Sequence, residues 1–401
     1  MRLILPRGIY GNRGDIASRW GLLRTLHQMG MEDVTVFRHL PEDIPPLPYP
    51  SLSYRPLRNL LLDRPARQAF RRAETVLWAV GLDMQDDSSL VRLLYLWNVF
   101  RLYRLLGPKI VCMFQGAGPI NTAIGRTLAR LALAKVNTFV ARDPGTLALI
   151  KRLNPKVNAV LAHDAIFLPG FEQDLNVVPA DEENFLGYLT ASNKRPLIGI
   201  NLRQWFHFTS SLLPYQFAQR AYRKRSEQRM AQLIDSMASV IASLRKHKQA
   251  RILLISAYQP GVMPWEDDLP WLQQIKARFA EDENVLLVDV PLSMPAYYAL
   301  IARLDLMIGM RLHSTLIALR LGVPALNLSY TLKGGDILNA MSLSQNVLDL
   351  NLFLESPQAV FERAASMLAD LPAERETVRR SVESAIQTNL SVMQNFLLKP
   401  R

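Results

Sequence analysis

Short apolar runs alternate with longer helix-like segments along nearly the whole chain, and this alternation restricts the fold more than any other feature. Runs such as residues 75–80, 109–114 and 251–256 have the length and composition of buried strands. A segment long enough for a helix follows each of them, and such a segment can return the chain to the start of a parallel strand. The sequence therefore predicts an α/β fold in which helices cover parallel sheets.

The alternation occurs twice, and polar sequence of mixed charge separates the two series at residues 172–195. A chain of 401 residues is too long for one ordinary hydrophobic core. We therefore predict two Rossmann-like doubly wound domains that face a cleft, an N-terminal one over residues 1–175 and a C-terminal one over residues 190–372. Residues 373–401 are predicted to form a helix that packs across both domains.

One strand–turn–helix–strand unit in the second series carries polar residues in a position typical of ligand sites. Residues 304–308 form an apolar run that ends at a glycine, and a helix is expected to follow. Ligands of doubly wound folds bind beyond the carboxyl ends of the strands, and the amides of a helix start favour an anion. Arg311, His313 and Ser314 lie there. On spacing alone, a polar helix cap beside a surface arginine explains them equally well.

The first series begins with a glycine-rich turn of the same kind. Gly8, Gly11 and Gly14 are spaced by three, and Asp15 follows close to the expected start of a helix. Glycine lets a backbone approach a ligand closely. Many α/β domains carry such a turn only for the packing of strand against helix, so this signal is weak without further support.

The unit around Arg311 resembles the C-terminal signature of the polysaccharide pyruvyl transferase family. In that family a Gly-x-Arg-Leu-His-Ser/Ala segment precedes an apolar helix, a Gly-x-Pro turn and a Tyr-x-x-Lys segment. Residues 309–314 match the first element and residues 330–333 match the last. Residues 11–15 are similar to the Gly-Asn-x-Gly-Asp turn that follows the family's first strand. The resemblance implies a GT-B-like fold, in agreement with the alternation of strands and helices.

Other matches lie between these two turns. Residues 115–119 resemble a Gln-Gly-x-Gly-Pro turn, and Arg142 with Asp143 resembles an Arg-Asp pair at the end of a strand. Asp164 begins a segment similar to the family's Asp-x-x-Phe, and we expect it to shape the turn rather than to react. The loop at residues 81–87 lacks the glycine triplet that family members often have, which puts a substrate role of this loop in doubt.

The resemblance implies that phosphoenolpyruvate is the donor, used as a co-substrate without a cofactor, and that the product is a pyruvate ketal on two hydroxyls of one sugar. A small, highly charged anion needs several cations around it, and arginine forks suit carboxylate and phosphate. An imidazole exchanges protons near neutral pH and can protonate the enol carbon. By this resemblance His313, Arg311 and Lys333 are catalytic, and Arg142, Arg203 and Ser314 bind the donor, mainly on the side of the C-terminal domain. Asn12, Gly14 and Asp15 bind the acceptor on the side of the N-terminal domain.

The formal net charge of +12 indicates an anionic partner. Zinc-finger spacing, an aromatic RNA-binding signature and a basic low-complexity tail are all missing from the sequence, so no nucleic-acid partner is expected. A membrane surface and a phosphorylated substrate remain as candidates for the anionic partner. An arginine-rich segment at residues 55–72 fits a helix on an anionic membrane, although a solvated helix explains it equally well. The six histidines show no paired ligand spacing, so no metal is expected.

The single cysteine, Cys112, lies in an apolar run and excludes an internal disulfide. We find no segment typical of a signal peptide or a membrane span, because arginines interrupt the apolar stretch at residues 93–106. We therefore expect a cytoplasmic enzyme, with peripheral contact at the inner face of the membrane left open. The resemblance implies that the acceptor is a glycan of a cell-surface polysaccharide or of its lipid-linked or nucleotide-linked precursor. Two alternatives stay open: a GT-B glycosyltransferase that uses a nucleotide sugar, and a non-catalytic anion-binding protein.

Overall fold

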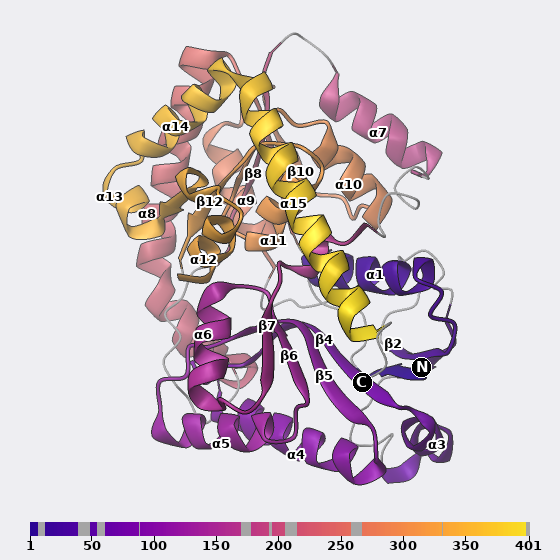
Figure 1. The fold of residues 1–401 in the computed structure, drawn as a ribbon. Coiled ribbons are helices and arrows are strands. Elements are labelled where there is room, and N and C mark those ends of the chain that lie inside the picture. Colours follow the sequence, from indigo (N-terminus) through magenta and orange to yellow (C-terminus); the bar gives the residue numbers. More distant parts are fainter. Residues whose placement is uncertain are drawn as a thin grey trace.

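The computed structural model contains two parallel sheets flanked by helices, which confirms the predicted α/β fold of two doubly wound, Rossmann-like units (Figure 1). It describes residues 1–6, 13–38, 49–53, 61–87, 89–169, 178–191, 195–204, 215–257, 267–330 and 332–397. The Arg55 and Arg58 positions of the arginine-rich segment lie outside these residues.

The N-terminal sheet has the strand order β3-β2-β1-β4-β5-β6-β7, and every neighbouring pair is parallel. Its strands are β1 (Leu3–Leu5), β2 (Val34–Arg38), β3 (Ser51–Ser53), β4 (Thr75–Met84), β5 (Lys109–Ala117), β6 (Thr138–Ala141) and β7 (Asn158–Leu161). The order reverses at β1, which lies between β2 and β4. This reversal is the topological switch point at which doubly wound folds bind ligands.

Helices cover both faces of this sheet because its strands are apolar on both sides. One face carries α3 (Arg64–Arg72), α4 (Leu90–Leu106), α5 (Ala123–Leu133) and α6 (Pro144–Leu153). The other face carries α1 (Arg13–Gln28), whose Trp20 and Leu23 are fully buried in one cluster with Phe114 of β5. The short helix η1 (Ala165–Phe167) follows β7 and packs beside α1.

The C-terminal sheet repeats the plan with the order β10-β9-β8-β11-β12-β13. Its strands are β8 (Leu197–Asn201), β9 (Arg251–Ile255), β10 (Val285–Val288), β11 (Leu306–Gly309), β12 (Ala325–Ser329) and β13 (Val347–Asp349). Its helices are α8 (Tyr215–Lys248), α9 (Leu269–Arg278), α10 (Met294–Ala302), α11 (Leu312–Arg320), α12 (Leu332–Ala340), α13 (Leu350–Glu355) and α14 (Gln358–Ala369). The order reverses at β8, next to β11 and the turn that leads into α11.

In the sequence, the polar segment that separates the two series contains a helix, α7 (Ala180–Thr190). Its apolar side buries Leu186 and Leu189 against α10, and its Glu182 carboxylate accepts the Ser293 backbone N–H at 2.6 Å. Ser293 caps the start of α10. The helix of this segment therefore packs on the C-terminal unit and stabilises the start of α10.

One hydrophobic cluster runs through both units and fixes their mutual position. It joins α1 of the N-terminal unit to α10 and α11 of the C-terminal unit. The last helix, α15 (Leu371–Leu397), belongs to the same cluster and crosses from the C-terminal unit back to the N-terminal one (Figure 1). The starts of α1 and α11, which follow β1 and β11 at the two switch points, are thereby brought to the boundary between the units.

Candidate active site

Gly14 and His313 lie in close contact across the boundary between the two units. A Cβ added to Gly14 would lie 2.0 Å from the Cβ of His313 and 2.2 Å from its Cγ, so no side chain fits at this position. Just before it, the backbone N–H of Arg13 donates to the carbonyl of Ala257 at 3.1 Å. The glycine in the first turn of α1 therefore lets α1 cover His313 directly.

The carboxylate of Asp164 is contacted by several side chains near His313. It lies between β7 and η1 and is fully buried. Its Oδ2 accepts a hydrogen bond from Nη1 of Arg142 at 2.9 Å, and its Oδ1 accepts one from the Ser18 hydroxyl at 3.2 Å. Nε2 of His313 lies 3.7 Å from Oδ2, close enough for an ion pair if the ring is protonated. Groups from β6, α1 and α11 thus meet at one carboxylate.

Burial alone raises the pKa of Asp164, but contact with His313 and the charge of Arg142 lower it more, and the pKa falls below its ordinary range. Asp164 is therefore ionised at neutral pH. Its negative charge can balance a positive charge on the His313 ring, and the arrangement also orients that ring. As expected, Asp164 shapes its turn too, because Oδ1 accepts the Ile166 N–H at 3.1 Å.

Arg142 keeps part of its hydrogen-bonding capacity. It follows β6, and its side chain is 5% exposed. Nη1 is paired with Asp164, whereas Nε has no hydrogen-bond partner among the residues that the structure describes. Gly116 lies beside this guanidinium, since a Cβ there would come within 3.0 Å of the arginine Nε. A buried guanidinium with an unused donor is a group that an anionic ligand can complete.

Arg311 is engaged by a carboxylate. Its Nη2 donates to Oδ1 of Asp268 at 2.7 Å, and its Nε lies 3.1 Å from both oxygens. Asp268 is fully buried, and the Arg311 side chain is 7% exposed. The backbone N–H of Arg311 also donates to Oδ1 of Asn201, at the end of β8. Arg311 therefore fixes the turn between β11 and α11 to the end of β8 and to the start of α9. An anionic ligand would have to share the Arg311 guanidinium with Asp268.

Ser314, in the first turn of α11, lies next to Tyr297 of α10. Both side chains are buried. Burial raises the pKa of the Tyr297 hydroxyl, and the Ser314 hydroxyl lowers it by a smaller amount, so the phenol is neutral at neutral pH. The Arg13 guanidinium lies over the Tyr297 ring, 4.6 Å from its centroid. Arg13 therefore links α1 to α10 beside the helix start.

The remaining predicted site residues are Arg203, Lys333, Asp15 and Asn12. Arg203 follows β8, donates to the Tyr330 hydroxyl and stacks over that ring at 5.3 Å. Lys333 lies in the first turn of α12, but its side chain is outside the described part of the chain. Asp15 lies in the first turn of α1 and is partly exposed, and Asn12 falls outside the described residues.

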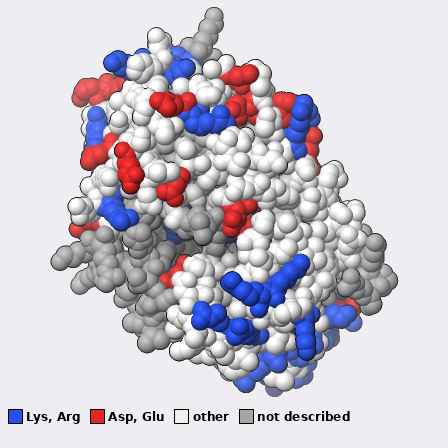
Figure 2. Space-filling model, turned by 60° about the vertical axis from the view of Figure 1, so that its left-hand side comes forward, with Lys and Arg blue, Asp and Glu red and all other residues white. Residues whose placement is uncertain are grey.

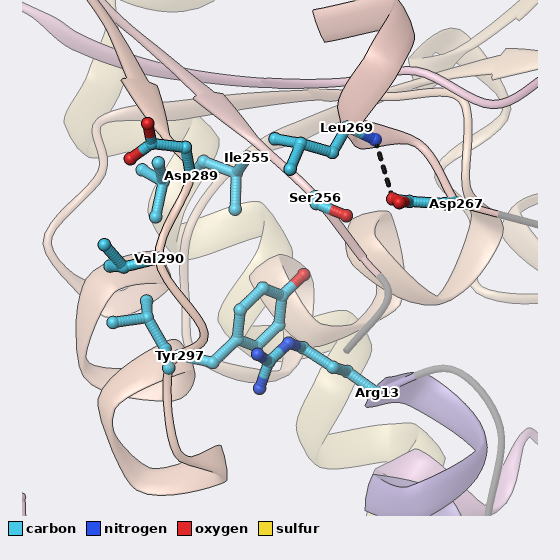
Figure 3. Close-up of a pocket in the computed structure, with 10 residues that line it drawn as sticks. Arg13, Ile255, Ser256, Asp267, Leu269, Asp289, Val290 and Tyr297 are labelled. Atoms are coloured by element: carbon cyan, nitrogen blue, oxygen red, sulfur yellow. Dashed lines mark hydrogen bonds between the residues drawn. The ribbon is translucent and has the colours of Figure 1, made fainter. Parts of the chain in front are cut away.

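A small pocket opens next to the site at the carboxyl ends of β9 and β10 (Figure 3). Arg13 and Tyr297 border it on one side, and Ser256 and Asp267 border it on another. Its volume is about 20 Å³, the room that about one water molecule needs. In the described residues no three His, Cys, Asp or Glu side chains are grouped as a metal site would require.

Sequence reasoning singled out His313, Arg142 and Gly14, which the structure brings together, but it missed three residues that contact predicted site residues. Asp164 was expected only to shape a turn, and Asp268 and Tyr297 were not singled out. A signal for Asp164 was available: Arg142 and Asp164 follow neighbouring strands of one parallel sheet, whose carboxyl ends share an edge. Asp268 gave no such signal, because the start of α9 carries no pattern that points to Arg311.

A model of the family described as polysaccharide pyruvyl transferase matches residues 12–331. No curated protein matches the chain.

Three solved structures illustrate the similarity of fold. UDP-GlcNAc 2-epimerase from Neisseria meningitidis, bound to UDP-GlcNAc, has 11% identity and a TM-score of 0.58, with 100% of each chain covered. Anabaena HepE in complex with UDP-glucose has 13% identity and a TM-score of 0.58, with coverage of 98% of this chain and 97% of that one. A glycosyltransferase from Rickettsia africae has 10% identity and a TM-score of 0.58, with coverage of 99% and 98%.

At such low identity these structures establish the fold alone, and they bear out the GT-B-like arrangement expected from the sequence. The family match extends from the first turn of the N-terminal unit to the turn before α12, and therefore includes the regions that form the site. The chain belongs to the polysaccharide pyruvyl transferase family, a family of transferases.

Proposed function

We propose that the protein transfers the pyruvyl group of phosphoenolpyruvate to a sugar of a cell-surface polysaccharide, or of its lipid-linked or nucleotide-linked precursor, and forms a pyruvate ketal. Family membership supports the reaction class. The observation that carries the proposal is the cluster of His313, Asp164 and Arg142, which combines a proton-transfer group with an incompletely paired buried cation.

In the proposed reaction His313 donates a proton to carbon 3 of the enol, and one sugar hydroxyl attacks carbon 2. Phosphate then leaves as a second hydroxyl of the same sugar closes the ketal. Of the two protons that the sugar hydroxyls lose, one restores the proton that His313 gave to carbon 3, and the other leaves with phosphate. Asp164 balances the charge on the His313 ring before the transfer and keeps the ring in place.

Donor binding is assigned to cations and amides around the start of α11. Arg142 contributes its unpaired Nε, and Ser314 lies at the helix start, where backbone N–H groups favour an anion. Arg203, which follows β8, and Lys333, which follows β12, are assigned to the donor as well. Arg311 contributes while it stays paired with Asp268, so we expect Arg311→Ala to weaken donor binding and to destabilise the fold as well.

Acceptor binding is assigned to Asn12 and to Asp15 in the first turn of α1, with Asp15 as the candidate base. Gly14 takes part by leaving room for His313. The lipid linkage of the acceptor and a cytoplasmic location stay predictions.

The test is incubation of the full chain with phosphoenolpyruvate and a panel of lipid-linked and nucleotide-linked glycans, followed by phosphate assay and product mass spectrometry. We expect one phosphate for each ketal, no turnover with His313→Ala and a raised KM for phosphoenolpyruvate with Arg142→Lys. Turnover that requires a nucleotide sugar would favour a glycosyltransferase instead. Salt-dependent anion binding that is unchanged in His313→Ala, without any turnover, would favour a non-catalytic anion-binding protein.

A further inference from the structure

Three neighbouring helices on the outer face of the N-terminal sheet carry arginine and no acidic residue. α4 lies between α3 and α5, and no Asp or Glu occurs within any of the three. We call their solvent side the basic face. Its exposed cations include Arg71, Arg72, Arg101, Arg104, Arg126 and Arg130.

The same face exposes large apolar side chains. Leu105 of α4 is 75% exposed and Ile124 of α5 is 63% exposed. On α4, Val91, Leu94 and Leu105 recur at helical spacing with Arg101 and form one stripe, opposite the side that packs on the sheet. Leucine beside arginine on one solvent-facing stripe is the pattern of a helix that lies in a membrane interface.

A helix that merely faces water looks different in this molecule. On α15 the exposed Arg379 pairs with Glu376 and Glu383, and Arg380 pairs with Glu376. Surface charges of both signs are interspersed there. Figure 2 shows the same contrast: Lys and Arg gather at the lower end of the molecule, where Figure 1 places α3, α4 and α5, and most acidic residues lie higher.

We propose that the basic face docks on the surface of an anionic lipid bilayer. The arginines complement the lipid head groups, and the leucines and isoleucine enter the boundary between head groups and acyl chains. A nucleic acid would match the charge but would leave the apolar side chains in water. In the described residues no helix is long and apolar enough to span a bilayer, so the proposed contact is with one surface only. The proposal does not depend on the proposed transfer reaction, because its test requires no turnover.

The first experiment is sedimentation of the full chain with vesicles of phosphatidylcholine alone and with vesicles that contain equal parts of phosphatidylcholine and phosphatidylglycerol. We expect binding to the anionic vesicles only, reduced about tenfold or more when the salt is raised from low to physiological concentration. The variant R71Q/R72Q/R130Q should lose about tenfold or more in binding.

The matched control, R278Q/R379Q/R380Q, removes the same formal charge from exposed sites on α9 and α15 and should bind like the parent. Both variants should show the thermal transition of the parent. A lack of binding to anionic vesicles at low salt, or equal loss in the two variants, would overturn the proposal.

A second variant separates lipid from other polyanions. L105S/I124S changes two highly exposed side chains, so we expect folding to be retained. It should bind anionic vesicles several-fold more weakly and should bind double-stranded DNA as the parent does. If L105S/I124S binds vesicles as tightly as the parent, and R71Q/R72Q/R130Q binds both vesicles and DNA more weakly, the face is a general polyanion surface and the membrane proposal fails.

Discussion

At the scale of single residues, the site is organised by buried charges that compensate one another. Asp164 compensates Arg142 and lies close to His313, and Asp268 compensates Arg311. Removal of one partner of a buried pair leaves an uncompensated charge, which typically costs about 3–5 kcal/mol. The acidic members of these pairs therefore matter for stability and, through the groups they hold, for chemistry.

The substitution Asp164→Asn tests this directly. We expect a loss of about 3 kcal/mol in the free energy of unfolding, because Arg142 stays buried without its counter-charge. In the transfer assay we expect kcat to fall by about 10²–10⁴, the range of a lost acid–base contribution. Chemical denaturation and steady-state kinetics measure the two effects. Parent-like values of both would show that the pair is dispensable.

The low pKa of Asp164 also predicts a dependence of stability on pH. The folded state holds the carboxylate with a pKa below its unfolded value of about 4. Its contribution is complete above the unfolded pKa and is lost as the pH falls through the folded pKa. Unfolding curves recorded between neutral pH and pH 3 should therefore show a steeper decline for the parent than for Asp164→Asn. Parallel declines would contradict the assignment of the pKa shift.

The substitution Gly14→Ala tests the contact between the units. The new Cβ would lie 2.0 Å from the Cβ of His313, so α1 or the ring must move, at a cost of about 1–3 kcal/mol. We expect lower stability and a strong loss of kcat. Gly187→Ala in α7 is the control, because nothing lies within 4 Å of its added Cβ. Calorimetry should show no loss of stability for Gly187→Ala.

At the scale of elements, α15 ties the site to the C-terminal end of the chain. Asn389 is fully buried, accepts the His163 backbone N–H at 2.8 Å and donates to the Asp164 carbonyl at 3.0 Å. A helix that starts in the C-terminal unit thus supports the backbone that carries Asp164. The amphipathic pattern of residues 373–401 indicated a helix across both units, but a single asparagine in that pattern could not identify the backbone it would meet.

We predict that Asn389→Ala lowers the free energy of unfolding by about 1–3 kcal/mol, because a partly buried N–H and a buried carbonyl of the backbone lose their partner. Because the Asp164 backbone is then less well held, kcat should fall while KM for phosphoenolpyruvate changes little. Gln387→Ala, an exposed position on the same helix, should change stability by less than about 0.5 kcal/mol. Equal effects of the two variants would argue against the bridging role of Asn389.

At the scale of the whole molecule, the sequence predicted the repeated parallel sheets because strand and helix periods are local properties of the chain. It also predicted that His313 lies at a helix start, but it placed Gly14 in the turn before the first helix, whereas α1 already begins at Arg13. It could not predict that Arg311 is held by Asp268, because such pairing depends on how distant elements pack. The roles of Asn12 and Lys333 stay predictions, since Asn12 and the Lys333 side chain lie outside the part of the chain that the structure describes.

The central claim is that His313 delivers a proton to the enol carbon of phosphoenolpyruvate during transfer to a sugar. The most direct measurement is the reaction in D₂O, with product mass spectrometry and a phosphate assay. We predict one deuterium in the ketal methyl group for each phosphate released, and neither product with His313→Ala. Phosphate release without deuterium in the methyl group, or an unchanged rate in His313→Ala, would contradict the account.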